Sequence, residues 1–292
     1  MRHQGIVQIL LSGFCFGFLG LFGKRAFGLG LSPGEFLAWR FLLAALLLGL
    51  HLRSRLLIGR APALRALLLG CCGYALFSTC YFMALQGLSV ALTVLLLYTY
   101  PLWVTLGARV FYGERLSRAQ WALFPVLLGG LLLLLWGEFA ARDPLYLGLG
   151  LLSSIFYSAY ILCSRRWLRG VPPMASSFYV VLGAGLALGA LHLRSHPAGA
   201  ELWLVLSGSA VISTILAISL FLSALQKLTG AEVSLLSLGE PVTAVLLGVL
   251  VLHESLSQIQ WLGAFTVLAA LVALSMAPPA VPLEIPAGSP DP

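Results

Sequence analysis

Long apolar runs dominate this sequence and restrict what it can fold into. Ten of them are about 20 residues long, which is the length of helix needed to cross a hydrocarbon core of roughly 30 Å. Only 9% of the 292 residues are charged, whereas soluble domains carry about a quarter, and the mean hydropathy is +1.00. We therefore predict an all-α polytopic membrane protein. Its ten predicted transmembrane helices lie at 5–23, 33–51, 65–86, 90–108, 119–137, 145–164, 174–191, 201–222, 231–251 and 258–277.

The positive charge is distributed unevenly among the predicted connections. With the N-terminus inside, twelve of the 17 Lys and Arg residues fall on the cytoplasmic side, four fall outside, and Arg40 lies within the second helix. This positive-inside bias predicts that both termini are cytoplasmic in a bacterial inner membrane. It accounts for the net charge of +7 without a nucleic-acid partner. The first run is expected to remain as a helix, because Lys24 and Arg25 follow it instead of a signal-peptide cleavage site.

Side chains that bind metals or perform catalysis are sparse within the apolar runs. The five histidines lie at or outside the predicted helix ends. The five cysteines lie inside apolar runs, where small buried hydrophobic residues are expected. A membrane-embedded enzyme would need a nucleophile with a base, or clustered His, Asp and Glu. We therefore predict no cofactor, no metal and no enzymatic activity.

The ninth run contains the most unusual residue pair of the chain, Glu240 followed by Pro241. A charged side chain near the middle of a membrane helix costs roughly 2.5 kcal/mol or more on insertion, so it marks a candidate functional site. Proline removes a backbone donor and loosens the helix beside that carboxylate. Glu240 is expected either to face an amino group or relay a proton, or to serve as a structural partner of a neighbouring helix or of Arg40.

The same stretch has a copy 140 residues earlier, so the chain contains an internal repeat. Ala84-Leu85-Gln86-x-Leu88 matches Ala224-Leu225-Gln226-x-Leu228, and Pro101 matches Pro241. Further on, Glu114-x-Leu116-Ser117-x-x-Gln120-Trp121 matches Glu254-x-Leu256-Ser257-x-x-Gln260-Trp261. Each repeat holds five predicted helices, and an odd number means that the second copy enters the membrane from the opposite side. We therefore predict two five-helix inverted repeats.

Inverted repeats are typical of transporters, whose substrate site lies near the midplane where the repeats meet. Interrupted helices at matching positions of the two halves are the best sequence indication of that site, and Pro101 and Pro241 fit this description as hinge residues. The copies differ at one chemically important position, because Tyr100 stands where Glu240 stands. The predicted organisation is a cytoplasmic N-terminus (1–4), the repeats (5–138 and 145–277) and a disordered cytoplasmic tail (278–292), which is rich in proline.

Polar and aromatic side chains recur on the predicted third, fourth and sixth helices. Hydroxyl groups facing lipid would lack hydrogen-bond partners, so these residues should face protein or a water-filled cavity. Plain core packing is the alternative to an aromatic cavity wall. The predicted substrate-binding residues are Tyr74, Ser78, Tyr81, Tyr98, Trp103, Tyr157, Tyr160, Ser237 and Glu240. Arg40 is expected either to reach the outer interface with its long side chain or to point inward as an ion partner.

Several of these motifs are similar to those of a known family. Glu240-Pro241 with Glu254-x-Leu256 and Gly263, and Trp39-Arg40-Phe41-Leu42-Leu43-Ala44 in the second helix, resemble the EamA-type repeat of the drug/metabolite transporter superfamily. The resemblance covers residues 5–277 and is greatest to the bacterial YddG-type exporters. It implies efflux of aromatic amino acids and related compounds, with a central cavity between the two halves.

These observations favour a secondary exporter of amino acids, with aromatic or apolar ones preferred, that works by alternating access. Protons are a possible coupling ion. A multidrug or lipophilic-cation exporter is the main alternative, because a carboxylate among aromatic rings suits cations. A passive facilitator on the same scaffold would need the same pathway. A sugar-phosphate or nucleotide-sugar exchanger is disfavoured, because Arg40 is the only cation in the interior of a predicted span.

Overall fold

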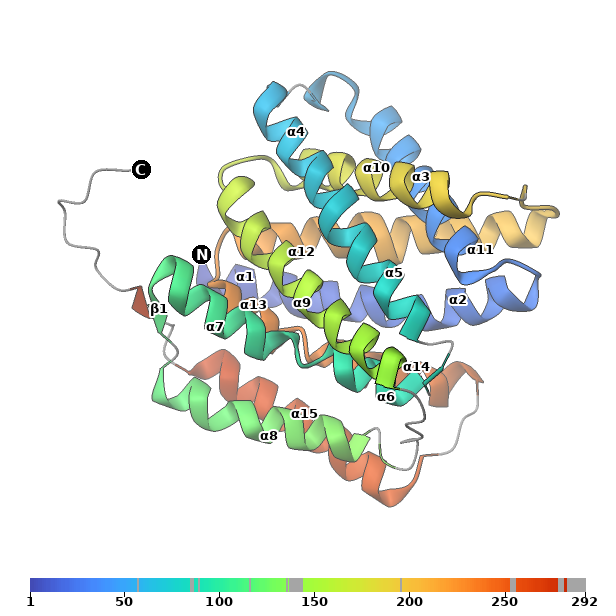
Figure 1. The fold of residues 1–292 in the computed structure, drawn as a ribbon. Helices are drawn as coiled ribbons and strands as arrows, with labels where there is room; N and C mark the ends of the chain where they lie inside the picture. Colours follow the sequence, from blue (N-terminus) through green and yellow to red (C-terminus); the bar gives the residue numbers. More distant parts are fainter. Residues whose placement is uncertain are drawn as a thin grey trace.

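The computed structural model describes residues 1–56, 58–84, 87–88, 90–115, 117–134, 136, 144–194, 196–252, 256–277 and 281–282. These residues are almost entirely helical (Figure 1). The α-helices are α1 (Arg2–Gly17), α2 (Leu19–Gly28), α3 (Pro33–Leu52), α4 (Arg60–Leu68), α5 (Ala75–Ala84), α6 (Val90–Leu97), α7 (Tyr100–Tyr112), α8 (Arg118–Leu134), α9 (Pro144–Trp167), α10 (Pro173–His192), α11 (Ala200–Ala210), α12 (Ala217–Leu225), α13 (Gly230–Leu236), α14 (Gly239–Leu252) and α15 (Gln258–Met276). The remaining elements are a 3-10 turn η1 (Arg53–Leu56), the π-helical turns η2 (Leu69–Tyr74) and η3 (Val211–Leu216), and the two-residue strands β1 (Glu114–Arg115) and β2 (Val281–Pro282).

Eight helical stretches in the described part of the chain are long and apolar enough to cross a bilayer. Some of them combine several elements, as in Arg60–Ala84, where α4, η2 and α5 form one continuous stretch. Two predicted spans differ from this pattern. The fourth is divided into α6 and α7, and the fifth, α8, is shorter at 17 residues. The helical membrane fold is therefore confirmed, whereas the number of ten spans remains a prediction.

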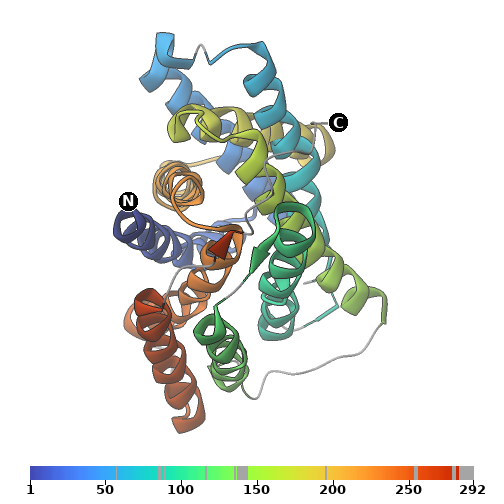
Figure 2. The ribbon, with the colours of Figure 1, turned by 90° about the vertical axis from the view of Figure 1, so that its left-hand side faces the viewer.

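Helices from the two halves of the chain pack in pairs that occupy matching positions. α3 packs along α10, and α8 packs along α15; Figures 1 and 2 show these two pairs on opposite sides of the bundle. Between them, α1 of the first half contacts α12 and α14, while α9 of the second half contacts α5 and α7. Each half therefore places its first long helix between helices of the other half, which creates a large interface in the centre.

Glycine permits the closest of these contacts. α1 carries Gly13 and Gly17 four residues apart, on one helix face, and both face α14. A Cβ atom at Gly17 would lie 2.7 Å from the Thr243 methyl carbon, and one at Gly13 would lie 3.5 Å from the Glu240 nitrogen. Gly13 and Gly17 thus form a packing surface between α1 and α14.

The repeated Ser-x-x-Gln motif forms helix N-caps. The Ser257 hydroxyl accepts a hydrogen bond from the Gln260 backbone N–H, and the Gln260 side chain accepts one from the Ser257 N–H. Ser117 and Gln120 form the same reciprocal pair at the start of α8. This part of the repeat is therefore conserved within the chain because both copies must begin a helix at this point.

Some predictions concern residues outside the described part of the chain. The motif residues Leu85, Gln86, Leu116 and Glu254 lie outside it, as does the predicted tail 278–292 apart from β2. β2 pairs with β1 in an antiparallel ladder, with Glu114 opposite Pro282. The domain boundaries remain predictions.

Candidate functional site

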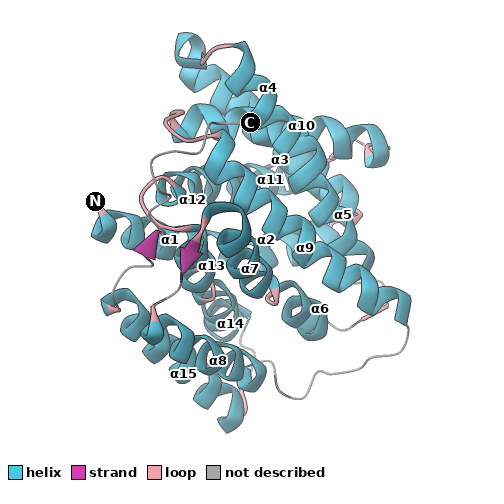
Figure 3. Ribbon diagram, turned by 60° about the vertical axis from the view of Figure 1, so that its left-hand side comes forward, coloured by secondary structure: helices cyan, strands magenta, loops and turns pink. Residues whose placement is uncertain are grey.

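The predicted fourth and ninth helices are both interrupted at matching positions. α6 ends at Leu97 and α7 starts at Tyr100, while α13 ends at Leu236 and α14 starts at Gly239. In Figure 3 the two broken helices lie next to each other near the middle of the bundle, with α7 beside α13. The interruptions expected from Pro101 and Pro241 therefore occur, and they occur together in space.

Proline explains why the helices break there. Pro241 has no N–H to donate to the carbonyl of Ser237, four residues earlier. The Glu240 N–H instead donates to this carbonyl at 3.0 Å, a tighter three-residue spacing. At the other break the Leu102 N–H donates to the Thr99 carbonyl, also at 3.0 Å. Each break thus begins a new helix with proline in its first turn, the position that best tolerates it.

Side chains of neighbouring helices support the first break. The hydroxyls of Thr99 and Ser154 lie 3.0 Å apart, and the Ser158 hydroxyl donates to the Tyr100 carbonyl at 3.1 Å. The Ser234 carbonyl of α13, which like α9 belongs to the second half, accepts a hydrogen bond of 3.1 Å from the Tyr100 hydroxyl. The polar groups released by the break are therefore used within the protein, as they must be at membrane depth.

A group of five tyrosines, here called the tyrosine cluster, surrounds the breaks. Tyr157 of α9 is at its centre, with its ring centroid 4.8 Å from that of Tyr100 and 6.2 Å from that of Tyr160. Tyr74 lies 5.3 Å from Tyr160, and Tyr98 lies 5.8 Å from Tyr100. Edge-to-face pairs such as Tyr100–Tyr157 are favourable beyond their burial. Apart from the half-buried Tyr157, the cluster is buried.

Glu240 reaches this cluster from the first turn of α14. It interacts with the Tyr98 side chain and is close enough to Tyr81 for a direct electrostatic effect. Its side chain is only half-buried although it lies inside the bundle. A carboxylate that keeps some accessible surface among tyrosines is placed to contact a solute or water in the bundle interior.

Arg40 lies beside Tyr74, another member of the tyrosine cluster. It is only 1% exposed, so it does not reach the outer interface, and its guanidinium lies 4.3 Å from the centroid of the Phe41 ring. Arg40 interacts with the Tyr74 side chain and attracts Glu240 electrostatically. Of the two orientations open from the sequence, the structure therefore shows the inward one.

The structure brings most of the predicted site residues together but treats the serines and Trp103 differently. The hydroxyls of Ser78 and Ser237 donate to carbonyls of their own helices, at 2.7 Å to Tyr74 and 2.8 Å to Val233. Tyr81 contacts Phe82 and lies near Glu240. Trp103 is 36% exposed, like its neighbours Leu102 (36%) and Leu106 (45%) on α7.

Residues that the sequence prediction left out complete the site. Tyr100 is one of the aromatic residues of the predicted fourth helix and the counterpart of Glu240, but it is not among the predicted site residues; it is 1% exposed and contacts Tyr98 and Tyr157. The repeat alignment itself carried this signal, because the residue equivalent to a central carboxylate should also be central. Phe77 and Phe221, which contact Tyr157 at 4.8 and 6.4 Å, had no sequence signal beyond their apolar character. Among the described residues, no group of three or more His, Cys, Asp or Glu could hold a metal ion.

Comparison with protein families places this arrangement in context. The model of the EamA-like transporter family matches the chain twice, at residues 3–136 and 145–276. The chain belongs to the EamA-like transporter family. The two matches correspond to the two halves that meet at the tyrosine cluster, so the chain has the two-repeat fold of EamA transporters.

Relatives of this EamA transporter include exporters and uncharacterised transporters. It is 30% identical over 168 residues to the pseudopaline exporter CntI of Pseudomonas aeruginosa strain UCBPP-PA14, a match covering 57% of this chain and 58% of that protein. It is 26% identical over 284 residues to the uncharacterised transporter YcbK of Bacillus subtilis strain 168, covering 89% and 88%. A crystal structure with 20% identity superposes with a TM-score of 0.80 over 94% of this chain and 98% of the other, which shows a shared fold.

Ion pairs connect the two halves of the EamA transporter at one end of the bundle, here called the basic end, where Arg2, Glu114 and Arg165 lie. Arg2 binds Glu232 at 3.1 Å, and Arg165 binds Glu114. Each pair joins one half to the other, because Arg2 and Glu114 precede residue 145 and their partners follow it. Arg25 and Glu201 form an exposed pair at the opposite end.

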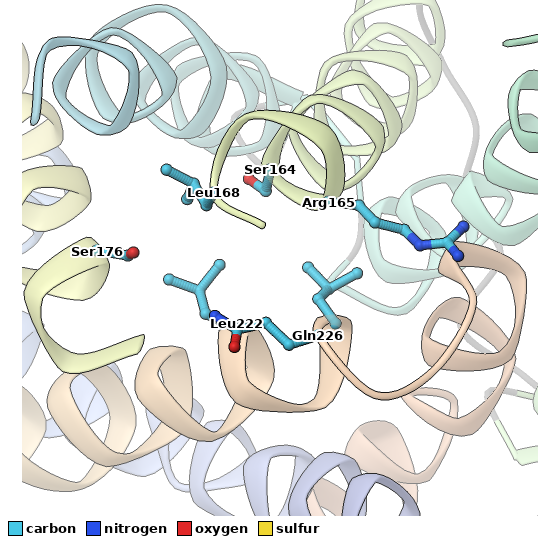
Figure 4. A pocket seen from close by; sticks show the side chains of 7 residues that line it. Ser164, Arg165, Leu168, Ser176, Leu222 and Gln226 are labelled. Atoms are coloured by element: carbon cyan, nitrogen blue, oxygen red, sulfur yellow. The ribbon is translucent and has the colours of Figure 1, made fainter. Parts of the chain in front are cut away.

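A small pocket lies at the basic end between α9, α10 and α12 (Figure 4). Its lining residues are Ser164, Arg165, Leu168, Ser176, Leu222, Leu225 and Gln226. The buried hydroxyls of Ser164 and Ser176 have no hydrogen-bond partner within the described residues. The pocket has room for about one water molecule but not for a solute of amino-acid size.

Proposed function

We propose that this EamA transporter exports amino acids, with aromatic or apolar side chains preferred, by alternating access across the bacterial inner membrane. In this proposal ten helices span the membrane as two inverted repeats, and both termini are cytoplasmic. The observation that carries the proposal is the position of Glu240 beside the tyrosine cluster at the two helix breaks. The carboxylate suits an ammonium group, and the tyrosine rings suit an aromatic side chain.

The packing of the broken helices supports a resting state that is closed at the basic end. α7 packs against α13 towards that end, and the Arg2–Glu232 and Arg165–Glu114 pairs reinforce the contact. Within the described residues no comparable packing joins α6 with α14. The positive-inside rule assigns the basic end to the cytoplasm. The proposed transporter therefore rests with its site directed outward, and Pro101 and Pro241 are the proposed hinges for closing that side.

Export as the direction of transport is supported by the relative named as a pseudopaline exporter. The match spans 58% of that protein, less than two thirds of its length, so its substrate is not transferred to this chain. The resemblance of the motifs to YddG-type exporters supports aromatic amino acids as the proposed substrates.

A lipophilic-cation exporter is the second candidate, and the half-buried Glu240 beside Tyr98 is the observation that favours it. Both candidates use the Glu240 carboxylate and the tyrosine rings. They differ in whether the solute itself must carry a carboxylate. Competition between labelled phenylalanine and a tetraphenyl cation separates them, because a site for amino acids is expected to prefer the zwitterion.

The decisive experiment is transport of labelled phenylalanine into liposomes that contain the purified protein, with and without an imposed pH gradient. We expect saturable transport that Glu240→Gln reduces at least tenfold. The matched control is Glu201→Gln, which removes an exposed carboxylate at the opposite end and should leave the rate unchanged. Transport that the gradient accelerates only in the wild type would support proton coupling. A transport rate that changes neither with the gradient nor with Glu240→Gln would indicate a facilitator in which Glu240 has a structural role. Absence of phenylalanine transport would refute the amino-acid proposal.

A further inference from the structure

Arg40 is a buried cation with unused hydrogen-bond donors. Its side chain is 1% exposed, and its Nε and Nη1 atoms have no hydrogen-bond partner among the residues that the structure describes. Buried polar groups are almost always paired, and unpaired ones need an explanation such as a bound ion or ligand. A guanidinium is an especially demanding case, because it stays charged in proteins. The two donors therefore indicate that something binds to Arg40 in the working protein.

The immediate surroundings hold the guanidinium without consuming these donors. Its central carbon lies 4.3 Å from the Phe41 ring centroid and 5.9 Å from that of Phe36. The faces of aromatic rings attract a cation, but they do not accept conventional hydrogen bonds from the N–H groups at the edge of the guanidinium. Tyr74 contacts Phe41 edge to face at 5.3 Å and interacts with Arg40, so it links the cation to the tyrosine cluster.

The residue of opposite charge at the tyrosine cluster is Glu240, which interacts with Tyr98, whereas Arg40 interacts with Tyr74. The two groups are close enough to attract each other. Neither takes part in the ion pairs Arg2–Glu232, Arg25–Glu201 and Arg165–Glu114. A cation and an anion thus lie at the same tyrosine cluster, each beside a different tyrosine.

We propose that Arg40 is the receptor for the carboxylate of the transported solute. This inference rests on the proposed function and specifies the substrate class as zwitterionic α-amino acids. The carboxylate of the solute binds the free donors of Arg40, its ammonium group faces Glu240, and its side chain contacts the tyrosine cluster. Arginine is suited to this role, because its guanidinium forms strong, directional, charge-assisted hydrogen bonds with carboxylates.

The test combines deletion of a ligand group with deletion of the protein group. Binding to the purified protein is measured for L-phenylalanine, for phenethylamine, which lacks the carboxylate, and for 3-phenylpropionate, which lacks the ammonium group. We expect the wild type to bind phenylalanine about ten- to a hundredfold more tightly than phenethylamine, as for loss of a charged hydrogen bond. In Arg40→Gln this ratio should fall close to one, with phenethylamine binding unchanged.

Two further variants complete the experiment. Arg40→Lys keeps the charge but not the planar donor arrangement, so it should restore part of the preference. Arg25→Gln removes an arginine at the opposite end of the bundle and should leave all three affinities unchanged. Thermal unfolding of each variant checks that it is folded. The comparison of phenylalanine with phenethylamine on the wild type tests the proposal without any variant.

The outcomes distinguish the two proposals. If the wild type binds phenethylamine as tightly as phenylalanine, no protein group recognises the carboxylate; the Arg40 proposal is then overturned, while export of aromatic amines remains open. Equal weakening of both ligands by Arg40→Gln would assign Arg40 a structural role and also overturn the proposal. If none of the three ligands binds, the amino-acid function itself fails together with the receptor role.

Discussion

Gly17→Ala is expected to destabilise the protein, because it adds a methyl group where α1 touches α14. The new Cβ would lie 2.7 and 2.8 Å from two carbon atoms of Thr243 and 3.1 Å from the Ala244 nitrogen. Non-bonded carbon atoms settle at about 3.5–4.0 Å, so the helices must separate by about 0.8 Å. Overpacking of this kind costs about 1–3 kcal/mol, and the higher helix propensity of alanine returns at most about 1 kcal/mol. We expect a net loss of about 1–2 kcal/mol.

Gly13→Ala is the matched control on the same helix face. Its Cβ would lie 3.5 Å from the nearest atom, the Glu240 nitrogen, which is an ordinary contact. This variant should therefore be as stable as the wild type, or more stable by up to about 1 kcal/mol. Thermal unfolding in detergent measures both variants, and phenylalanine binding shows whether the displaced α14 carries Glu240 out of position. Equal stability of the two variants, or a more stable Gly17→Ala, would refute the packing argument.

Three further predictions concern other parts of the molecule. Trp103→Leu should leave binding and transport of phenylalanine within about twofold of the wild type, because the Trp103 side chain is exposed on α7 beside the exposed Leu102 and Leu106; a larger loss would place it in the pathway. Ser257→Ala should lower stability by about 1 kcal/mol in thermal unfolding through loss of an N-cap, and an unchanged midpoint would contradict the cap. A double-mutant cycle of Glu114→Gln and Arg165→Gln should give a coupling energy of about 1–2 kcal/mol, because Glu114 is only 5% exposed; additive effects would show that the pair does not hold the basic end together.

The helical spans and the break positions were predictable from local sequence, for reasons visible in single residues. An apolar run in a bilayer has few alternatives to a helix, because its backbone polar groups must be satisfied internally. Pro101 and Pro241 cannot donate a backbone hydrogen bond, which favours a helix break near each of them. The repeat also predicted that the two breaks lie close together, because equivalent positions of two interleaved halves meet at their interface.

Which face of a helix points inward was harder to predict. Trp103 and Tyr100 lie three residues apart on α7, and hydropathy does not separate an aromatic residue facing lipid from one facing the interior. The tertiary structure exposes Trp103 and buries Tyr100 against Tyr157. The same limit applied to Arg40, whose long side chain is able to reach either the interface or the interior.

The sequence by itself determined that this chain is a helical membrane protein of two related halves with a proline-broken helix and a carboxylate at its centre. These properties depend on hydrophobicity, chain symmetry and backbone chemistry, which are local. Only the tertiary structure decided that Arg40 and Glu240 lie at the same cluster of five tyrosines, and that ion pairs join the two halves at the basic end. Those relations join residues as far apart as 230 positions, and they depend on how α1, α3, α9 and α14 pack rather than on any short stretch of sequence.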